Sequence, residues 1–239
     1  MIRRFQLHLD TPLPPHAAYA LYAALLERAP GDFSARVHQM GVTPVSQYVH
    51  GDCWYVSLLG QEAVQALSPV LEDMAAIRLL RQEQPIRFLG KEVSGVWGVE
   101  QLLDAPAPDA FRLELRTPTS FKSAGHYQLL PTQRLLLQSL ILKWNGCFGD
   151  ICPIEDEGGG LEAMASGIRY RAVELDTRDF RIKRTAIPGV VGSIRVQDQL
   201  SGFHRQLAAA LLEFGGYAGV GIKTALGMGG MTVQKKGEC

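Results

Sequence analysis

The sequence predicts an α+β protein made of two ferredoxin-like (RRM-like) domains in tandem, each with the order β-α-β-β-α-β. Strand-like alternation and helix-like periodicity follow one another along the 239 residues. A stretch of prolines and small residues, 104–109, divides the chain, and the same order of elements recurs on both sides of it. We therefore place an N-terminal domain at residues 1–105 and a C-terminal domain at residues 106–239.

In the first domain, residues 3–9 alternate between polar and apolar side chains and predict a strand. Prolines follow, and the apolar stripe of the next segment predicts a helix. Asp32 is expected to cap a short second helix that Gly41 ends. The remaining elements are expected in this order: a helix at 16–28, strands at 45–50 and 53–58, a helix at 61–81, and strands at 86–88 and 92–102.

The second domain repeats the outline with one long insertion. An acidic, glycine-rich loop at 150–160 is expected between the first helix and the second strand. The elements are expected as a strand at 111–115, a helix at 132–144, strands at 169–181 and 190–197, a helix at 199–214 and a strand at 230–234, after a glycine-rich loop at 217–230.

The charge of the chain is balanced overall but unevenly distributed. There are 24 basic and 24 acidic residues, and the basic excess lies in two segments, 112–143 and 169–184. A focused basic surface can bind phosphates even on a neutral protein, because salt confines its field to about 8 Å. A solvated strand face explains the same charges equally well.

Neither targeting signals nor cysteine spacing indicate an extracellular or membrane protein. The first residues lead into a strand pattern rather than a signal peptide, and no apolar run reaches the roughly 18 residues of a membrane span. The cysteines Cys53, Cys147, Cys152 and Cys239 lack paired spacings, so neither a disulfide framework nor a zinc site is expected. We expect a cytoplasmic protein with reduced cysteines, no metal and no cofactor.

The glycine-rich segment 217–230 is the most informative part of the chain. Glycine lets backbone amides approach a ligand closely, so such a loop can wrap a phosphate, and Lys223 and Thr224 add a cation and a hydroxyl. It is not a nucleotide-binding P-loop, because Ile222 separates Gly221 from Lys223 and no helix of the required length follows. A dinucleotide fingerprint fails because no βαβ unit opens here.

The segment does contain glycine-hydrophobic-glycine twice, separated by five residues. Its glycines are Gly219, Gly221, Gly227 and Gly229. This pattern resembles the C-terminal signature of the Cas6 family, the CRISPR repeat endoribonucleases of the RAMP superfamily. Two further stretches, 117–122 followed by Leu130-Pro131, and 187–193, resemble the same family in the same order.

The resemblance implies an endoribonuclease that binds CRISPR repeat RNA and cuts pre-crRNA into guide units without a metal. The ribose 2′-OH would attack the adjacent phosphate and leave a 2′,3′-cyclic phosphate and a 5′-OH. Such a cut needs an acid, a base and cations around the phosphorane. The resemblance leaves open whether the chain acts alone, as a homodimer, or with other Cas proteins of an effector complex.

Six histidines can transfer protons near neutral pH. The family's catalytic histidine precedes a short Pro-and-Ser motif, and His38, ahead of Thr43-Pro44-Val45-Ser46, fits that position. A place at the end of a short helix favours its protonated form by up to about 1 kcal/mol, which suits a general acid. The alternatives are a capping or surface role for His38 and catalysis by His50. His8 and His204 are expected to be structural.

Cations complete the expected site. Lys122, inside a family motif, and Lys223 are expected near the transition state. The residues expected to bind the repeat are Arg181, Lys183, Arg184, Lys223, Thr224 and the four signature glycines, with Trp144 and Tyr127 as candidates for base stacking, although Trp144 also fits a core position.

Two other functions fit parts of the sequence. A RAMP subunit of an effector complex would bind RNA without cutting it. An unrelated enzyme would use the glycine-rich loop for a small phosphorylated ligand.

Overall fold

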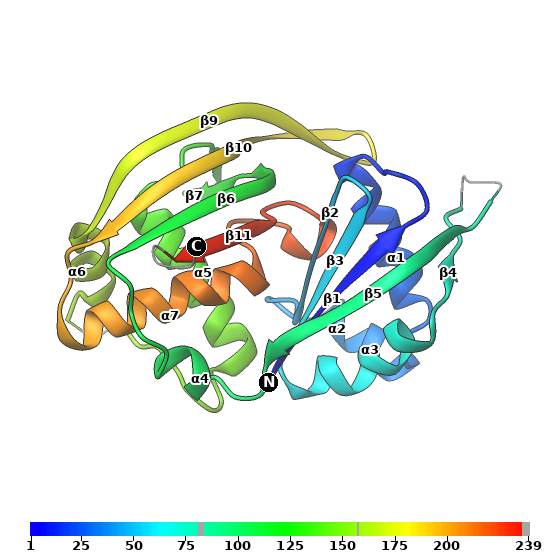
Figure 1. Ribbon diagram of the computed structural model, residues 1–239, viewed down its shortest axis with the longest axis horizontal. Helices are drawn as coiled ribbons and strands as arrows, with labels where there is room; N and C mark the ends of the chain where they lie inside the picture. The colour runs from blue at the N-terminus through cyan, green and yellow to red at the C-terminus, as the bar shows by residue number, and fades with distance from the viewer. Residues whose placement is uncertain (81–83, 157, 236–239) are drawn as a thin grey trace.

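The computed structural model describes residues 1–80, 84–156 and 158–235, and each half has the β-α-β-β-α-β order around an antiparallel sheet (Figure 1). The predicted fold class is confirmed. The first half contains β1 (Ile2–Leu9), η1 (Pro15–Ala17), α1 (Ala18–Leu26), α2 (Gly31–Val37), β2 (Val45–His50), β3 (Cys53–Leu59), α3 (Gln61–Asp73), β4 (Ala76–Ile77) and β5 (Ile86–Val96).

The second half begins after a short helix and a segment without regular structure, where the linker is expected. Its elements, with that helix first, are α4 (Glu100–Leu103), β6 (Ala110–Thr119), β7 (Phe121–Ser123), β8 (His126–Gln128), α5 (Gln133–Phe148), α6 (Gly160–Gly167), β9 (Ile168–Ile182), β10 (Thr185–Asp198), α7 (Gly202–Ala218), η2 (Thr224–Leu226) and β11 (Met231–Lys235).

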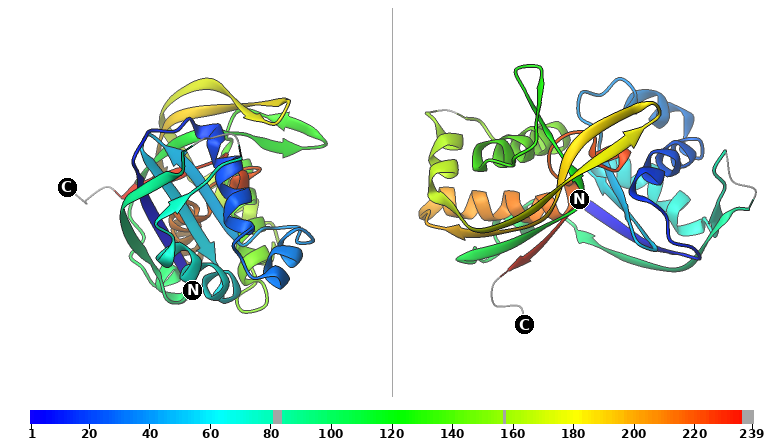
Figure 2. Two further views of the ribbon diagram at one scale, coloured as in Figure 1. Left: turned by 90° about the vertical axis from the view of Figure 1, so that its right-hand side faces the viewer. Right: turned by 90° about the horizontal axis from the view of Figure 1, so that it is seen from above.

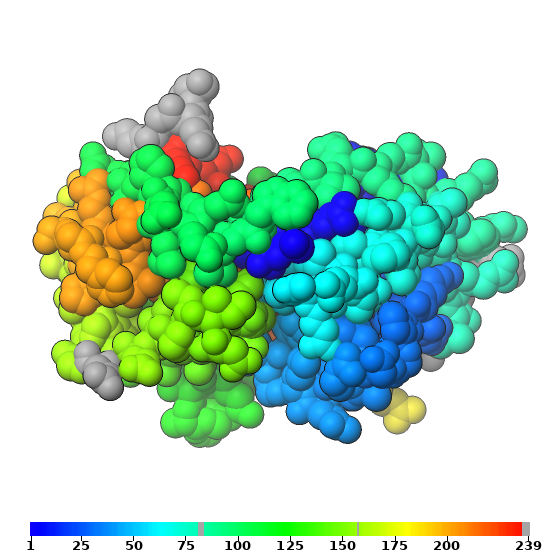
Figure 3. All heavy atoms as spheres, turned by 90° about the horizontal axis from the view of Figure 1, so that it is seen from below, coloured from blue at the N-terminus to red at the C-terminus, as the bar shows by residue number. Residues whose placement is uncertain are grey.

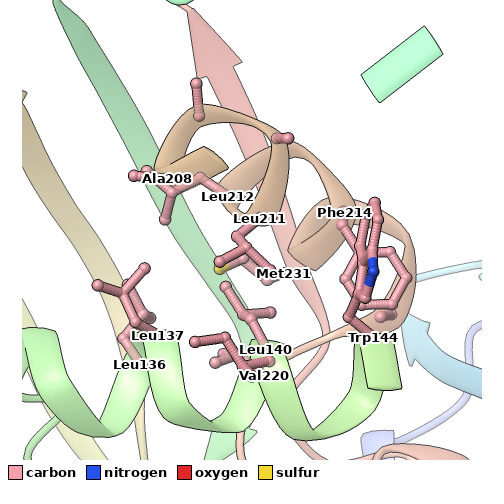
Figure 4. Packing of buried hydrophobic residues seen from close by; sticks show 14 of the residues in the cluster. Leu136, Leu137, Leu140, Trp144, Ala208, Leu211, Leu212, Phe214, Val220 and Met231 are labelled. Carbon is pink, nitrogen blue, oxygen red and sulfur yellow. The ribbon is translucent and has the colours of Figure 1, made fainter. Parts of the chain in front are cut away.

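The two sheets have the same topology. Their strand orders are β2-β3-β1-β5-β4 and β11-β6-β10-β9, so in each the first strand lies between the third and the last strand of its unit. Alternation along β1 buries Phe5 and Leu7 under the helices of the first half. In the second half, α5 and α7 cover one face of the sheet, and Figure 4 shows Leu140 of α5 beside Leu211 of α7 and Met231 of β11.

Several element boundaries differ from the sequence-based expectation. Helix α3 ends at Asp73, because Met74 is already extended (ψ 113°) and Ala76 and Ile77 pair with β5. The expected end of that helix, Arg81, lies outside the described residues. Strand β5 is continuous from Ile86 to Val96, where two strands are expected. Residues 100–103 form a helical turn instead of a strand end, because Val99 and Leu102 bury one common face.

Other local predictions also need correction. Helix α6 begins inside the expected acidic loop, at Gly160. Asp32 is not a helix cap: it lies in the first turn of α2, after Pro30, and pairs with Arg36. Residues 121–128 form the hairpin β7–β8, whose turn residues Ala124 and Gly125 both have positive φ, as a tight hairpin turn requires. The hairpin projects from the body of the molecule (Figure 2).

The two halves meet along the middle of the molecule (Figure 3). The long β9–β10 hairpin reaches across to the first half (Figure 1). Near its tip Phe180 and Ile187 form a small apolar cluster with Met228 of the glycine-rich loop. Gln47 of β2 ties the halves together, because its buried amide nitrogen donates to Ala18 O at 3.0 Å and to Ala225 O at 2.8 Å.

The described part of the chain contains no helix long and apolar enough to cross a membrane. Within it, no group of three or more His, Cys, Asp or Glu side chains is placed to hold a metal ion. Cys53, Cys147 and Cys152 are free thiols. Cys239 lies outside the described residues.

Candidate functional site

A groove of about 650 Å³ lies between the two halves. Its walls are α1, the segment from the end of α2 to β2, strand β7, helix α5 and the loop between α7 and β11. His38, Lys122, Lys143 and Lys223 all line it, whereas no Asp or Glu of the described residues does. A groove with several cations and no carboxylate is suited to an anion.

His38 and the two predicted cations come from three separate elements. His38 is the C-terminal cap residue of α2 and is exposed. Lys122 is exposed on β7, and Lys223 is exposed in the glycine-rich loop in a left-handed conformation (φ 55°). The fold therefore brings together His38, Lys122, Lys223 and Thr224, which the sequence predicts as site residues.

The signature glycines permit close backbone packing. A Cβ on Gly221 would lie 2.3 Å from Ser120 O, one on Gly229 2.0 Å from Val220 O, and one on Gly227 2.4 Å from the Cβ of Ala18. Gly219 also has a positive φ, and a Cβ there would lie 2.7 Å from Gly229 O.

Most amides of this loop donate within the protein, including those of Gly219, Gly221 and Gly229. Among the described residues, the amides of Lys223, Thr224, Ala225 and Gly227 show no acceptor outside η2. The free backbone donors that the loop offers a ligand therefore lie within residues 223–227.

Lys143 of α5 also lines the groove, although no sequence motif predicts it as a site residue. Its ammonium donates to Ala218 O at 2.9 Å and to Thr224 Oγ1 at 2.6 Å. Burial lowers the pKa of Lys143 to about 7, while the nearby thiol of Cys147 acts weakly in the opposite direction. In the sequence, Lys143 could be noticed as a site residue only because its neighbours on the predicted helix are largely apolar. A lysine on the exposed side of a helix gives the same pattern, so the sequence does not distinguish the two roles.

Tyr19 and Tyr22 of α1 also line the groove. The hydroxyl of Tyr22 is buried and has no hydrogen-bond partner among the described residues. Burial raises the pKa of Tyr22 well above its usual range, so the phenol stays protonated at neutral pH.

Comparisons with known proteins show which family the chain belongs to. The family model described as "CRISPR-associated endoribonuclease Cas6" matches residues 113–231. A Cas6 endoribonuclease of Mycobacterium tuberculosis is 30% identical over an alignment 251 residues long, which covers 95% of this chain and 76% of that protein. This chain belongs to the Cas6 family. A Cas6 endoribonuclease of Streptococcus thermophilus is 27% identical and covers 92% of each chain.

Solved Cas6 structures share the fold. A structure described as a Cas6 product complex superposes with a TM-score of 0.79 at 24% identity, over 98% of this chain and 100% of that one. Thermus thermophilus Cas6 gives a TM-score of 0.71 at 21% identity, over 98% of both chains. The Cas6 resemblance seen in the sequence motifs is thereby confirmed, together with the tandem ferredoxin-like fold.

The remaining predicted residues of this Cas6 family member lie outside the groove. His50 ends β2, and a strand of six residues spans about 20 Å, so His50 lies far from the groove at the other end of the strand. Arg181, Lys183 and Arg184 are exposed at the tip of the β9–β10 hairpin, where the ammonium of Lys183 lies 5.8 Å from the ring centroid of Tyr19.

The two aromatic residues predicted as candidates for base stacking differ in their exposure to solvent. Trp144 is fully buried between Phe148 and Phe214 in the core of the second half. Tyr127 is 46% exposed on β8. His8 lies on β1 and its Nε2 is 2.8 Å from the carboxylate of Glu92. Of the two aromatic candidates, only Tyr127 is accessible to a nucleic-acid base.

Proposed function

We propose that this Cas6 family chain cuts CRISPR repeat RNA in the groove between its two halves, with His38 as the general acid and without a metal. The supporting observation is that His38, Lys122 and Lys223, from three distant parts of the chain, line one groove to which no described Asp or Glu contributes. We take residues 1–105 and 106–239 as the two domains that form its walls. Because the substrate is a transcript, the proposed location is the cytoplasm.

The proposed reaction uses only protein side chains. The ribose 2′-hydroxyl gives up its proton to solvent water, and its oxygen forms a bond to the adjacent phosphorus while the bond from phosphorus to the 5′-oxygen breaks. The products are a 2′,3′-cyclic phosphate and a 5′-OH, and His38 supplies the proton that the departing 5′-oxygen takes up. Lys122 and Lys223 line the same groove, and in this proposal they balance the charge that develops on the phosphorane.

RNA outside the groove would follow the exposed basic and aromatic residues on either side. Arg181, Lys183 and Arg184 lie at the tip of the β9–β10 hairpin, beside α1. Tyr127 is exposed on the β7–β8 hairpin, on the strand that pairs with Lys122. Cations bind the phosphates irrespective of sequence, whereas an aromatic ring can stack on an unpaired base.

The two alternative functions have less support. The curated relatives are described as endoribonucleases, which does not favour a RAMP subunit that binds RNA without cutting it. A small phosphorylated ligand is not favoured either, because most amides of the glycine-rich loop are already bonded within the protein.

The test is cleavage of labelled cognate repeat RNA in excess EDTA by wild type, His38→Ala and His50→Ala. We expect wild type to yield a cyclic phosphate and His38→Ala to be slower by about 100-fold or more, since general acid–base steps contribute about 10²–10⁴. His50→Ala is the matched control, because His50 is exposed at the far end of β2. Tight binding without cleavage by wild type would favour the RAMP subunit, and unimpaired cleavage by His38→Ala would remove the acid role.

A further inference from the structure

Lys143 carries a buried charge whose hydrogen-bond partners are neutral. The residue is partly exposed and lines the groove, and burial lowers the pKa of its ammonium. It donates to the carbonyl of Ala218, at the end of α7, and to the hydroxyl of Thr224, in the glycine-rich loop. Within the part of the chain that the structure describes, no ion pair joins it to a carboxylate. A buried cation without a counter-ion costs stability, which points to a role in function.

The groups around this ammonium add positive charge. The titratable and charged side chains that line the groove with Lys143 are Tyr19 and Tyr22 of α1, His38 after α2, Lys122 of β7 and Lys223 of the loop. Cys147 lies on α5 itself, and α6 and α7, the helices packed against α5, contribute no charged side chain to the groove within the described residues. None of these side chains is a carboxylate. An anion with hydrogen-bond acceptors is therefore the partner that this arrangement lacks, and a phosphodiester is such an anion.

We propose that Lys143 is a positioning residue that couples RNA binding to the shape of the glycine-rich loop, with an RNA phosphate as its counter-ion. The bond to Thr224 fixes the segment that presents Lys223, and the bond to Ala218 fixes the point where the loop leaves α7. Ser139, one turn earlier on α5, supports the same loop by accepting from the amide of Gly221 at 3.0 Å. This inference rests on the proposed function, because it takes repeat RNA as the ligand.

The coupling makes RNA affinity depend on pH. In the free protein burial lowers the pKa of Lys143 to about 7, so its ammonium is partly deprotonated at neutral pH. A phosphate beside it raises that pKa, so binding takes up a proton and weakens as the pH rises above about 7. His38 is present in both wild type and a Lys143 variant, so the difference between their pH profiles reports on Lys143.

The experiment measures Kd from pH 6.5 to 8.5 by fluorescence anisotropy. The probe is the cognate repeat RNA with a 2′-deoxyribose at the mapped cleavage position, so that binding is separated from cleavage. The proteins are wild type, Lys143→Met and, as a matched control, Lys91→Met. Lys91 also donates to two backbone carbonyls, Leu71 O at 2.9 Å and Glu72 O at 2.5 Å, but lies on β5 outside the groove.

We expect the log Kd of wild type to rise by up to about one unit per pH unit above pH 7. Lys143→Met is expected to bind about 10- to 100-fold more weakly at pH 6.5, with a flatter profile. Lys91→Met should follow wild type. A Lys143→Met profile parallel to that of wild type would overturn the inference.

A second variant covers the case in which Lys143→Met does not fold. Thr224→Val keeps the shape of the side chain but removes the hydroxyl that accepts from Lys143. It is expected to bind RNA more weakly while it keeps the pH slope, and wild-type affinity for this variant would overturn the inference. A wild type that binds with the expected slope but does not cleave in EDTA would refute the proposed function alone.

Discussion

Gly221 lies so close to Ser120 that a Cβ atom on Gly221 would be 2.3 Å from the Ser120 carbonyl oxygen. The same carbonyl accepts from the amide of Ile222 at 2.9 Å, so it cannot easily move aside. In this Cas6 family chain the signature glycine therefore holds the loop after α7 against the segment between β6 and β7.

The first prediction compares Gly221→Ala with Gly125→Ala. Both glycines have positive φ, but nothing lies within 4 Å of a Cβ on Gly125. Left-handed backbone costs a non-glycine residue about 1–2 kcal/mol, and a backbone clash adds about 1–3 kcal/mol. In urea denaturation Gly221→Ala should lose about 2–5 kcal/mol of unfolding free energy, and Gly125→Ala about 1–2 kcal/mol. Equal losses would show that strain alone, without the contact to Ser120, explains the glycine.

The second prediction concerns Gln47, which is 1% exposed and bonded through both ends of its amide. Its oxygen accepts from Trp54 Nε1 at 2.8 Å. Its nitrogen donates to one carbonyl of α1 and one carbonyl of η2, and so links these two elements. Gln47→Leu leaves these three groups without their partner, so thermal unfolding should show a loss of about 2–4 kcal/mol. Gln101→Leu, an exposed residue with one hydrogen bond, should stay within about 0.5 kcal/mol of wild type. A small effect at Gln47 would contradict its role as a tie between the halves.

Much of this architecture could be predicted, because strand alternation and helix periodicity are local. The order of the main strands and helices and the grouping of Lys223 with Thr224 follow from such patterns. Tertiary contacts decided the rest. Residues 76–77 leave the helical pattern because they pair with β5. The role of Lys143 depends on two hydrogen-bond acceptors that are 75 and 81 residues away in sequence. A single sequence carries no local signal for such distant pairs.

The third prediction separates the groove lysines from other surface charges. Lys122 and Lys223 face the groove, whereas Lys91 does not. If each groove lysine contacts one phosphate, its change to alanine should lower the slope of log Kd against log salt concentration by about 0.7–0.9. The measurement is filter binding of uncleavable repeat RNA at salt concentrations from about 50 to about 300 mM, a range that includes physiological ionic strength. Slopes for Lys122→Ala and Lys223→Ala that match that of Lys91→Ala would place the phosphates elsewhere.

The last prediction follows from the buried ammonium of Lys143, whose pKa burial lowers to about 7. Between that pH and about 10.4, the usual value for lysine, the unfolded chain binds a proton that the folded chain does not. Stability of wild type therefore falls as the pH falls through this window, and the loss is complete below pH 7. Replacing Lys143 with Met removes that penalty together with two hydrogen bonds.

At pH 7 we therefore expect Lys143→Met to be more stable than wild type in urea denaturation, by an amount on the order of 1–3 kcal/mol. The gain should shrink as the pH approaches 10, where the lysine is neutral in both states. RNA affinity should fall in the same variant. A lysine kept only for structure would give the opposite result, with lower stability at pH 7, so the sign of this difference decides whether Lys143 serves the fold or the RNA.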